Sequence, residues 1–197
     1  LFPYTTLFRS FHNKIKGYTQ NRQPGIEADM EPKPIAELEE YKAAGKLENK
    51  VALITGGDSG IGRAIAILYA KEGANVAIGY YDEHQDAEDT VNRLQEMGVK
   101  AKAYAHDLKD EKQSQKLIKD VINDFGSLNI LVNNGGVQFP RDHFEDITPQ
   151  QVKETFMTNI FGMMFLSQAA VPYLSEGDTI INTTSVTAYR GSEIGRA

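Results

Sequence analysis

The sequence predicts a doubly wound α/β fold built on a parallel β-sheet, and three observations support this. Residues 51–54 form a short apolar run typical of a strand that is buried on both faces. A glycine-rich turn follows, and beyond it apolar residues recur at helical spacing, at Ile61, Ala64, Ile65, Leu68 and Tyr69. Further along, apolar runs and helical patterns alternate, as in folds whose helices cover both faces of a parallel sheet.

The remaining elements are expected in a regular order. The later strands are predicted at residues 75–80, 100–105, 129–133 and 179–184. The helices between them are predicted at residues 86–97, 110–125 and 148–174. The last of these begins with Thr148, Pro149 and Gln151, which is the pattern of a capping box. Since parallel strands end at one edge of the sheet, functional residues are expected at that edge.

Composition narrows the class of protein. The chain has 197 residues, of which 41% are hydrophobic and 24% charged, as in a soluble protein with one sizeable domain. Its net charge of −6, without a basic cluster, argues against a nucleic-acid partner. No apolar run is long enough for a membrane span, and no secretory signal is evident. Without cysteine, disulfides and thiolate metal sites are excluded, and we expect a cytoplasmic protein without a metal site.

The two ends and the stretch before the first strand are set apart from the domain. Residues 1–10 (LFPYTTLFRS) and 193–197 (EIGRA) read as translated sequencing adapters, so both are predicted to be artefacts. Residues 11–50 are polar and punctuated by proline, which predicts an extended arm, with a short helix at residues 36–44. The arm is either a disordered linker or a segment laid across a neighbouring subunit. The domain itself is expected to comprise residues 51–192.

The glycine-rich turn reads TGGDSGIG at residues 55–62. Glycines allow the backbone to approach a pyrophosphate without Cβ clashes, and the free N–H groups of the first helical turn attract anions. A plain turn between a strand and a helix would need only one glycine. We therefore interpret the turn as a phosphate-binding loop, whose candidate residues are Gly56, Asp58, Ser59, Gly60, Ile61 and Gly62.

These residues, taken as a unit, resemble the TGxxxGxG motif of the short-chain dehydrogenases/reductases. The arm, with its Gln-Pro-Gly at residues 23–25 and Met-x-Pro-x-Pro at residues 30–34, resembles a branch of that family with an N-terminal extension. The resemblance runs from about residue 20 to residue 192. It implies a Rossmann-type fold that binds NAD or NADP, and the interconversion of a small-molecule alcohol and a carbonyl compound by hydride transfer.

The resemblance also points to cofactor-binding residues at the other strand ends. Tyr80 stands where an acid usually meets the ribose 2′-OH of NAD, and Tyr81 stands where a basic residue often follows. Asp82 and Glu83 come next and would repel a 2′-phosphate only if they pointed inward. The choice between NAD and NADP stays open, with a slight preference for NAD.

Two further motifs of the family have counterparts here. Asp107 and Leu108 resemble the pair whose aspartate hydrogen-bonds near the adenine. The sequence Asn133-Asn134-Gly135-Gly136 resembles the NNAG motif, with Gly135 where alanine is usual, and the resemblance assigns Asn134, Gly135 and Gly136 to the cofactor pocket. His106, beside Asp107, is interpreted as a structural residue.

The resemblance assigns catalytic roles to two residues. Asn159 matches the asparagine that ties a water molecule into the proton relay, and Ser185 matches the serine that hydrogen-bonds the oxygen of the substrate. The family's acid–base pair, a tyrosine whose pKa is lowered by a lysine four residues later, falls beyond Ala197. Tyr189 comes too early to replace it. The chain as given is therefore predicted to be inactive, and poorly soluble or unstable.

The resemblance further implies a homotetramer that packs through the helix predicted at residues 148–174. Two alternatives remain. One is a catalytically dead NAD(P)-binding sensor whose output is contact with another protein. The other is a relative of the sugar-nucleotide epimerases, although these usually begin with GxxGxxG rather than with the motif found here.

Overall fold

The fold is seen in a computed structural model that describes residues 20, 22, 25–30, 32–38, 40–141 and 143–186. The segments 1–10 and 193–197, predicted to be artefacts, lie outside the described residues, as does Tyr189.

The described chain forms a five-stranded parallel sheet in the order β3-β2-β1-β4-β5. The strands are β1 (Val51–Thr55), β2 (Asn75–Tyr80), β3 (Ala101–Ala105), β4 (Ile130–Asn133) and β5 (Thr179–Asn182). Between β1 and β4 the strand order reverses, which is where α/β proteins of this type bind ligands. The predicted fold class is confirmed.

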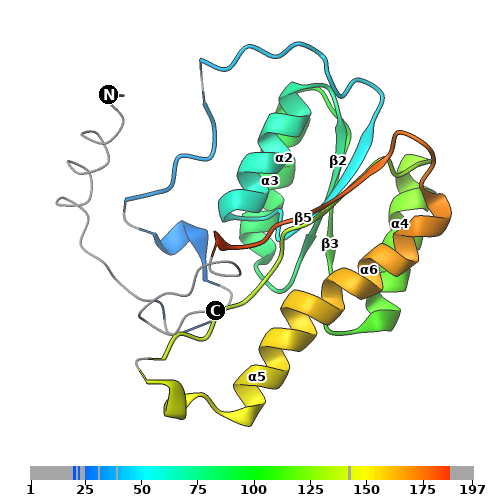
Figure 1. The fold of residues 1–197 in the computed structure, drawn as a ribbon. Coiled ribbons are helices and arrows are strands. Elements are labelled where there is room, and N and C mark those ends of the chain that lie inside the picture. The colour runs from blue at the N-terminus through cyan, green and yellow to red at the C-terminus, as the bar shows by residue number, and fades with distance from the viewer. Residues whose placement is uncertain are drawn as a thin grey trace, which may run out of the picture.

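Helices cover both faces of the sheet, so the molecule has three layers (Figure 1). One face carries α2 (Gly60–Lys71) and α3 (His84–Glu96), and the other carries α4 (Glu111–Phe125) and α6 (Gly162–Ala170). Each face has its own core: Ile54 packs beneath α2 and α3, whereas Leu53 packs beneath α4 and α6. Both side chains are 0% exposed, as expected for a strand buried on both faces.

The predicted long helix is one rod with a local change of winding. It comprises α5 (Pro149–Phe156), a π-helical turn η3 (Met157–Phe161), α6 and a 3₁₀ turn η4 (Val171–Tyr173). The capping box at its start is confirmed: Thr148 Oγ1 accepts from Gln151 N at 3.2 Å, and Gln151 Oε1 accepts from Thr148 N at 3.0 Å. The π turn contains Asn159. Such turns often mark functional sites in helices.

The arm differs from the prediction. Residues 36–38 and 40–44 are not helical, and the arm instead contains a 3₁₀ turn, η1 (Glu27–Asp29). The expected helix is wrong because backbone donors of this stretch bind elsewhere: the N–H groups of Ala44 and Lys46 donate to a Glu72 carboxylate oxygen, at 3.1 and 2.8 Å. The Tyr41 hydroxyl also bonds to Glu72. The described part of the arm therefore packs along the domain of its own chain (Figure 1).

Candidate functional site

Two neighbouring strand ends are tied together at the centre of the sheet. The Thr55 hydroxyl oxygen, at the end of β1, accepts from the backbone N–H groups of Asn134 and Gly135, at 3.0 and 2.9 Å. The Asn134 side-chain amide donates to the Thr55 carbonyl at 3.1 Å. These bonds hold the segment after β4 against the start of the glycine-rich turn.

The glycine-rich turn has a backbone shape that other residues would not reproduce. Gly56 has φ of +60°, a conformation that favours glycine. Its N–H group donates to the Gly79 carbonyl at 2.8 Å, which ties the turn to β2. A Cβ on Gly62 would lie 1.8 Å from the Gly56 carbonyl oxygen, so only glycine allows the first turn of α2 to pack so closely.

A cavity of about 470 Å³ lies at the carboxyl edge of the sheet, and most of the predicted cofactor-binding residues line it. The glycine-rich turn contributes Gly56, Asp58, Ser59 and Ile61. The chain after β2 and β3 contributes Tyr80, Tyr81, Asp107 and Leu108, and the chain after β4 contributes Asn134, Gly135 and Gly136. Segments far apart in the sequence thus meet around one space, as the topology predicts.

The end of the cavity beside β2 and β3 is aromatic and charged. The Lys109 ammonium group lies 6.0 Å from the centre of the Tyr81 ring and 3.7 Å from the Asp107 carboxylate. Asp107 also accepts from the Lys109 N–H at 2.9 Å, which closes a tight turn after β3. The Tyr80 hydroxyl is 2.9 Å from Nδ1 of His84. This end offers flat apolar surface together with groups of both charges.

Burial shifts the pKa of several groups on the cavity wall. It raises the pKa of Asp58, and together with the neighbouring Asp82 carboxyl group it raises the pKa of Glu83 to about 7. Burial lowers the pKa of His106 to about 4, so this imidazole is neutral at pH 7. Neither ring nitrogen of His106 has a hydrogen-bond partner among the described residues, although the residue is only 6% exposed. The wall therefore carries less negative charge than its carboxyl groups suggest.

Four of the predicted site residues are not among those that line the cavity. Gly60 and Gly62 belong to the first turn of α2. Asn159 lies next to the wall: its side-chain amide accepts from the N–H and donates to the carbonyl of Val137, each at 2.8 Å. Ser185 is exposed in the chain after β5. The roles expected of these residues in phosphate binding, in the proton relay and in substrate binding stay predictions.

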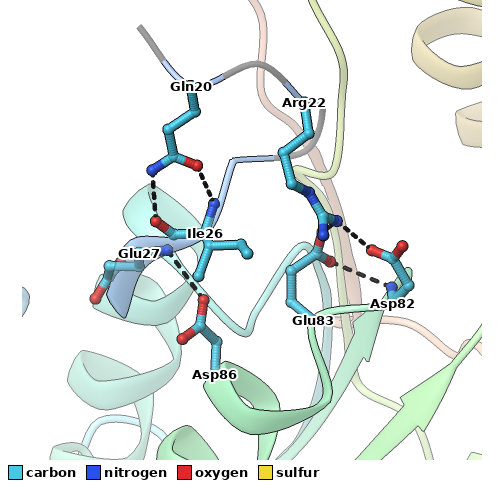
Figure 2. Close-up of polar contacts among 7 residues, drawn as sticks. All are labelled: Gln20, Arg22, Ile26, Glu27, Asp82, Glu83 and Asp86. Atoms are coloured by element: carbon cyan, nitrogen blue, oxygen red, sulfur yellow. Dashed lines mark hydrogen bonds and ion pairs between the residues drawn. The ribbon is translucent and has the colours of Figure 1, made fainter. Parts of the chain in front are cut away.

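The arm contributes a carboxylate to the start of α2. Glu27, which is 7% exposed, accepts from the Gly60 N–H at 2.5 Å and pairs with Arg63 at 2.8 Å. Its own N–H group donates to Asp86 at 3.0 Å (Figure 2). The Gly60 N–H group was expected to face a bound phosphate. In the structure it donates to Glu27 and so holds the arm against α2. Nothing in the sequence pattern singled out Glu27.

Several lining residues were not assigned to the site from the sequence: Gly79, Glu83, His106, Lys109, Val137, Phe139, Glu154, Thr158 and Thr183. Four of them, Gly79, His106, Lys109 and Val137, directly adjoin predicted residues at the strand ends, so a wider window around each strand end would have included them. Glu154 and Thr158 come from α5 and the π turn; Thr158 adjoins the predicted residue Asn159, whereas no motif pointed to Glu154. Thr183 donates to the Asn134 side-chain oxygen at 3.3 Å, which links β5 to the same edge.

The described part of the chain contains neither a metal-binding cluster nor a membrane-spanning helix. No group of three or more histidine, aspartate or glutamate side chains there is placed to hold a metal ion. No helix there has the length and apolar character that crossing a membrane requires.

Comparisons with known proteins agree with this geometry. Residues 50–196 match the short chain dehydrogenase family. The chain is 48% identical over 183 residues to general stress protein 39 of Bacillus subtilis (strain 168), covering 93% of this chain and 64% of the relative. It is 42% identical over 181 residues to glucose and ribitol dehydrogenase of Daucus carota, covering 88% and 62%.

A solved structure is also similar: a short chain dehydrogenase from Burkholderia cenocepacia J2315 in complex with NADP, with a TM-score of 0.74 and 36% identity. The similarity covers 76% of this chain and 61% of that one. This chain spans less than two thirds of the length of the curated relatives it matches, 64% and 60% for the first two. On the glycine-rich turn, the cavity and these matches together, the chain belongs to the short chain dehydrogenase family.

Proposed function

We propose that the protein containing this chain interconverts an alcohol and a carbonyl compound by hydride transfer with NAD or NADP. The observation that carries the proposal is the cavity, where the glycine-rich turn meets Asp107, Leu108 and the segment after β4. Membership of the family supports it, as does the name of the Daucus carota relative, which describes a dehydrogenase of a sugar and a polyol. We therefore propose a small hydroxylated molecule or its carbonyl form as substrate.

The residues present fit a dinucleotide. Gly56 and Gly135 approach each other so closely that a Cβ on Gly56 would lie 3.0 Å from the Gly135 Cα, which leaves backbone rather than side chains facing the cavity. His106 lines the same wall as a neutral imidazole. When bound, the cofactor would supply the hydride. The glycine-rich turn would hold its phosphates, and the residues after β2 and β3 would hold its adenosine half.

Two residues are proposed to act nearer the reacting atoms. Ser185 follows β5 and would donate a hydrogen bond to the substrate oxygen once a substrate is present. Asn159 fixes the backbone of Val137, which lines the cavity, and so would keep the wall of the site in place. Its relay role would require one of these bonds to be shared with a water molecule.

The test is a comparison of the 197-residue chain with the intact protein, meaning the product of the source gene that contains residues 11–192. We expect both to bind NADH or NADPH, detected by nicotinamide fluorescence. Only the intact protein should oxidise the reduced cofactor when given aldehydes or ketoses, because the chain as given lacks the tyrosine–lysine pair. Turnover by the chain alone, free of host enzymes, would contradict this. Binding without any turnover by the intact protein would favour the sensor instead.

We further propose that the intact protein is a homotetramer that packs through the rod formed by α5, η3 and α6. Large apolar side chains stay exposed along it, among them Phe156 (53%), Ile160 (48%) and Met164 (55%). An exposed row of this kind is typical of a surface that packs against another protein. Sedimentation of the intact protein should give the mass of four chains, and a monomer at micromolar concentration would contradict the proposal.

A further inference from the structure

Arg22 of the arm forms ion pairs with two acidic residues that follow β2. Its guanidinium group lies 2.6 Å from an Asp82 carboxylate oxygen and 2.7 Å from a Glu83 carboxylate oxygen. The Asp82 N–H group also donates to Glu83, at 3.2 Å (Figure 2). One cation from outside the domain therefore serves two carboxylates at once.

The two acidic residues stand at the edge of the cavity. Glu83 lines it, and its side chain is 2% exposed, whereas that of Asp82 is 50% exposed. In α/β folds of this type, the residues that follow this strand lie near the adenosine ribose. The cavity wall carries four acids, Asp58, Glu83, Asp107 and Glu154, and one lysine, Lys109; burial raises the pKa of Asp58 and Glu83 and so reduces part of this negative charge. An additional negative charge at this edge would work against a 2′-phosphate.

Arg22 is held in place by the rest of the arm. Gln20, two residues before Arg22, exchanges two hydrogen bonds with the backbone of Ile26, at 2.6 and 2.7 Å. The next residue, Glu27, is fastened to α2 and α3 by its bonds to Gly60, Arg63 and Asp86 (Figure 2). Arg22 therefore stands between two described residues, Gln20 and Glu27, that are held by hydrogen bonds.

We propose that Arg22 sets the relative affinity of the site for NADP over NAD, acting through Asp82 and Glu83. Arg22 neutralises part of the charge of the two carboxylates, and this lowers their repulsion of the 2′-phosphate of NADP. Arg22 also occupies carboxylate oxygens that would otherwise accept a hydrogen bond from the free 2′-OH of NAD. Arg22 is a positioning residue here. The proposal rests on the proposed cofactor site and adds a determinant that lies outside the nucleotide-binding domain.

The experiment measures dissociation constants of NADPH and NADH for the intact protein and its variants. Arg22→Gln removes the positive charge. We expect the dissociation constant of NADPH, divided by that of NADH, to rise about tenfold, because a single unit charge then no longer offsets the acidic pair near the 2′-phosphate at a partly solvated site. Arg22→Lys should restore most of the original ratio. Arg93→Gln is the matched control: Arg93 also pairs with the arm, through Glu37 at 2.9 Å, but neither Glu37 nor its other partner, Glu96, lines the cavity.

A double variant separates this role from a merely structural one. If Arg22 acts by neutralising the acidic pair, Arg22→Gln combined with Asp82→Asn should bring the ratio back toward the parent value. If Arg22 only holds the arm, both cofactors should weaken by the same factor in Arg22→Gln, and this would overturn the inference. An unchanged ratio would overturn it as well. Failure of the parent protein to bind either cofactor would instead contradict the proposed function.

Discussion

Gly62 shows how tightly a single position constrains this site. The Gly56 carbonyl oxygen occupies the space that a Cβ on Gly62 would need. The Asn134 side-chain nitrogen would lie only 2.7 Å from such a Cβ. Both neighbours are themselves fixed, one by the turn and the other by its bonds to Thr55. The close approach of helix α2 to the turn therefore depends on the absence of a side chain at this one residue.

Gly62→Ala should displace the turn and disrupt the site. We expect it to lower the free energy of unfolding by about 3 kcal/mol, because the new methyl group would overlap backbone atoms, and to weaken NADPH binding at least about tenfold. Urea unfolding and fluorescence titration measure the two effects. Gly135→Ala is the control, since its Cβ would first meet the end of the flexible Leu108 side chain, at 3.0 Å. If both variants were equally stable, the steric argument would fail.

His106 makes the stability of the folded protein depend on pH. Burial lowers the pKa of its imidazole to about 4, against 6.5 in the unfolded chain. Between these values the unfolded state binds more protons than the folded state, so acidification favours unfolding. Above about pH 6.5 both states are neutral at this residue, and its contribution to stability no longer changes with pH.

We expect the cofactor-free protein to lose about 2 kcal/mol of stability through His106 alone between pH 7.5 and pH 5. Glutamine at this position cannot titrate. Between pH 7.5 and pH 5 the free energy of unfolding of His106→Gln should therefore fall by about 2 kcal/mol less than that of the parent protein. Urea unfolding at the two pH values gives the comparison. Parallel stability curves for the parent and the variant would show that His106 is not buried in its neutral form.

At the scale of elements, the arm completes helix α2. The N-cap residue Ser59 makes no side-chain bond to the helix, and the Glu27 carboxylate takes its place by accepting from the Gly60 N–H. A carboxylate at this end also interacts favourably with the helix dipole. Helix and arm are therefore expected to stabilise each other.

Glu27→Ala should remove both the cap and the pair with Arg63. Since Arg63 would be left half-buried without this partner, we expect a loss of about 2 kcal/mol in the free energy of unfolding. Limited proteolysis should also cut the arm faster. Glu40→Ala removes an exposed carboxylate of the same arm, and it should change neither the free energy of unfolding nor the rate at which the arm is cut. An arm cut at the parent rate in Glu27→Ala would contradict the role assigned to Glu27.

The rod formed by α5, η3 and α6 shows where local sequence patterns lose their predictive value. Its start was predictable because Thr148, Pro149 and Gln151 form a local cap. The π turn was not, because Asn159 bonds to Val137, which lies 22 residues earlier and on another element. Propensity and periodicity carry no information about such a partner.

For the whole molecule, the sequence predicted the sheet and its helices, because burial on both faces and helical spacing leave clear patterns in residues such as Leu53 and Ile54. It predicted most of the cavity wall, because parallel strands end at one edge. It did not predict the docking of the arm, which depends on charge pairs more than 30 residues apart, such as Arg63 with Glu27 and Arg22 with Asp82.

The most direct test of the account is hydrogen exchange of the intact protein, measured by mass spectrometry with and without NADPH. We predict slower exchange in four segments that are distant in sequence, at residues 56–62, 80–83, 106–109 and 134–137, because they surround one cavity. Unchanged exchange in these segments, or protection confined to the rod of α5 and α6, would contradict the assignment of this cavity as the cofactor site.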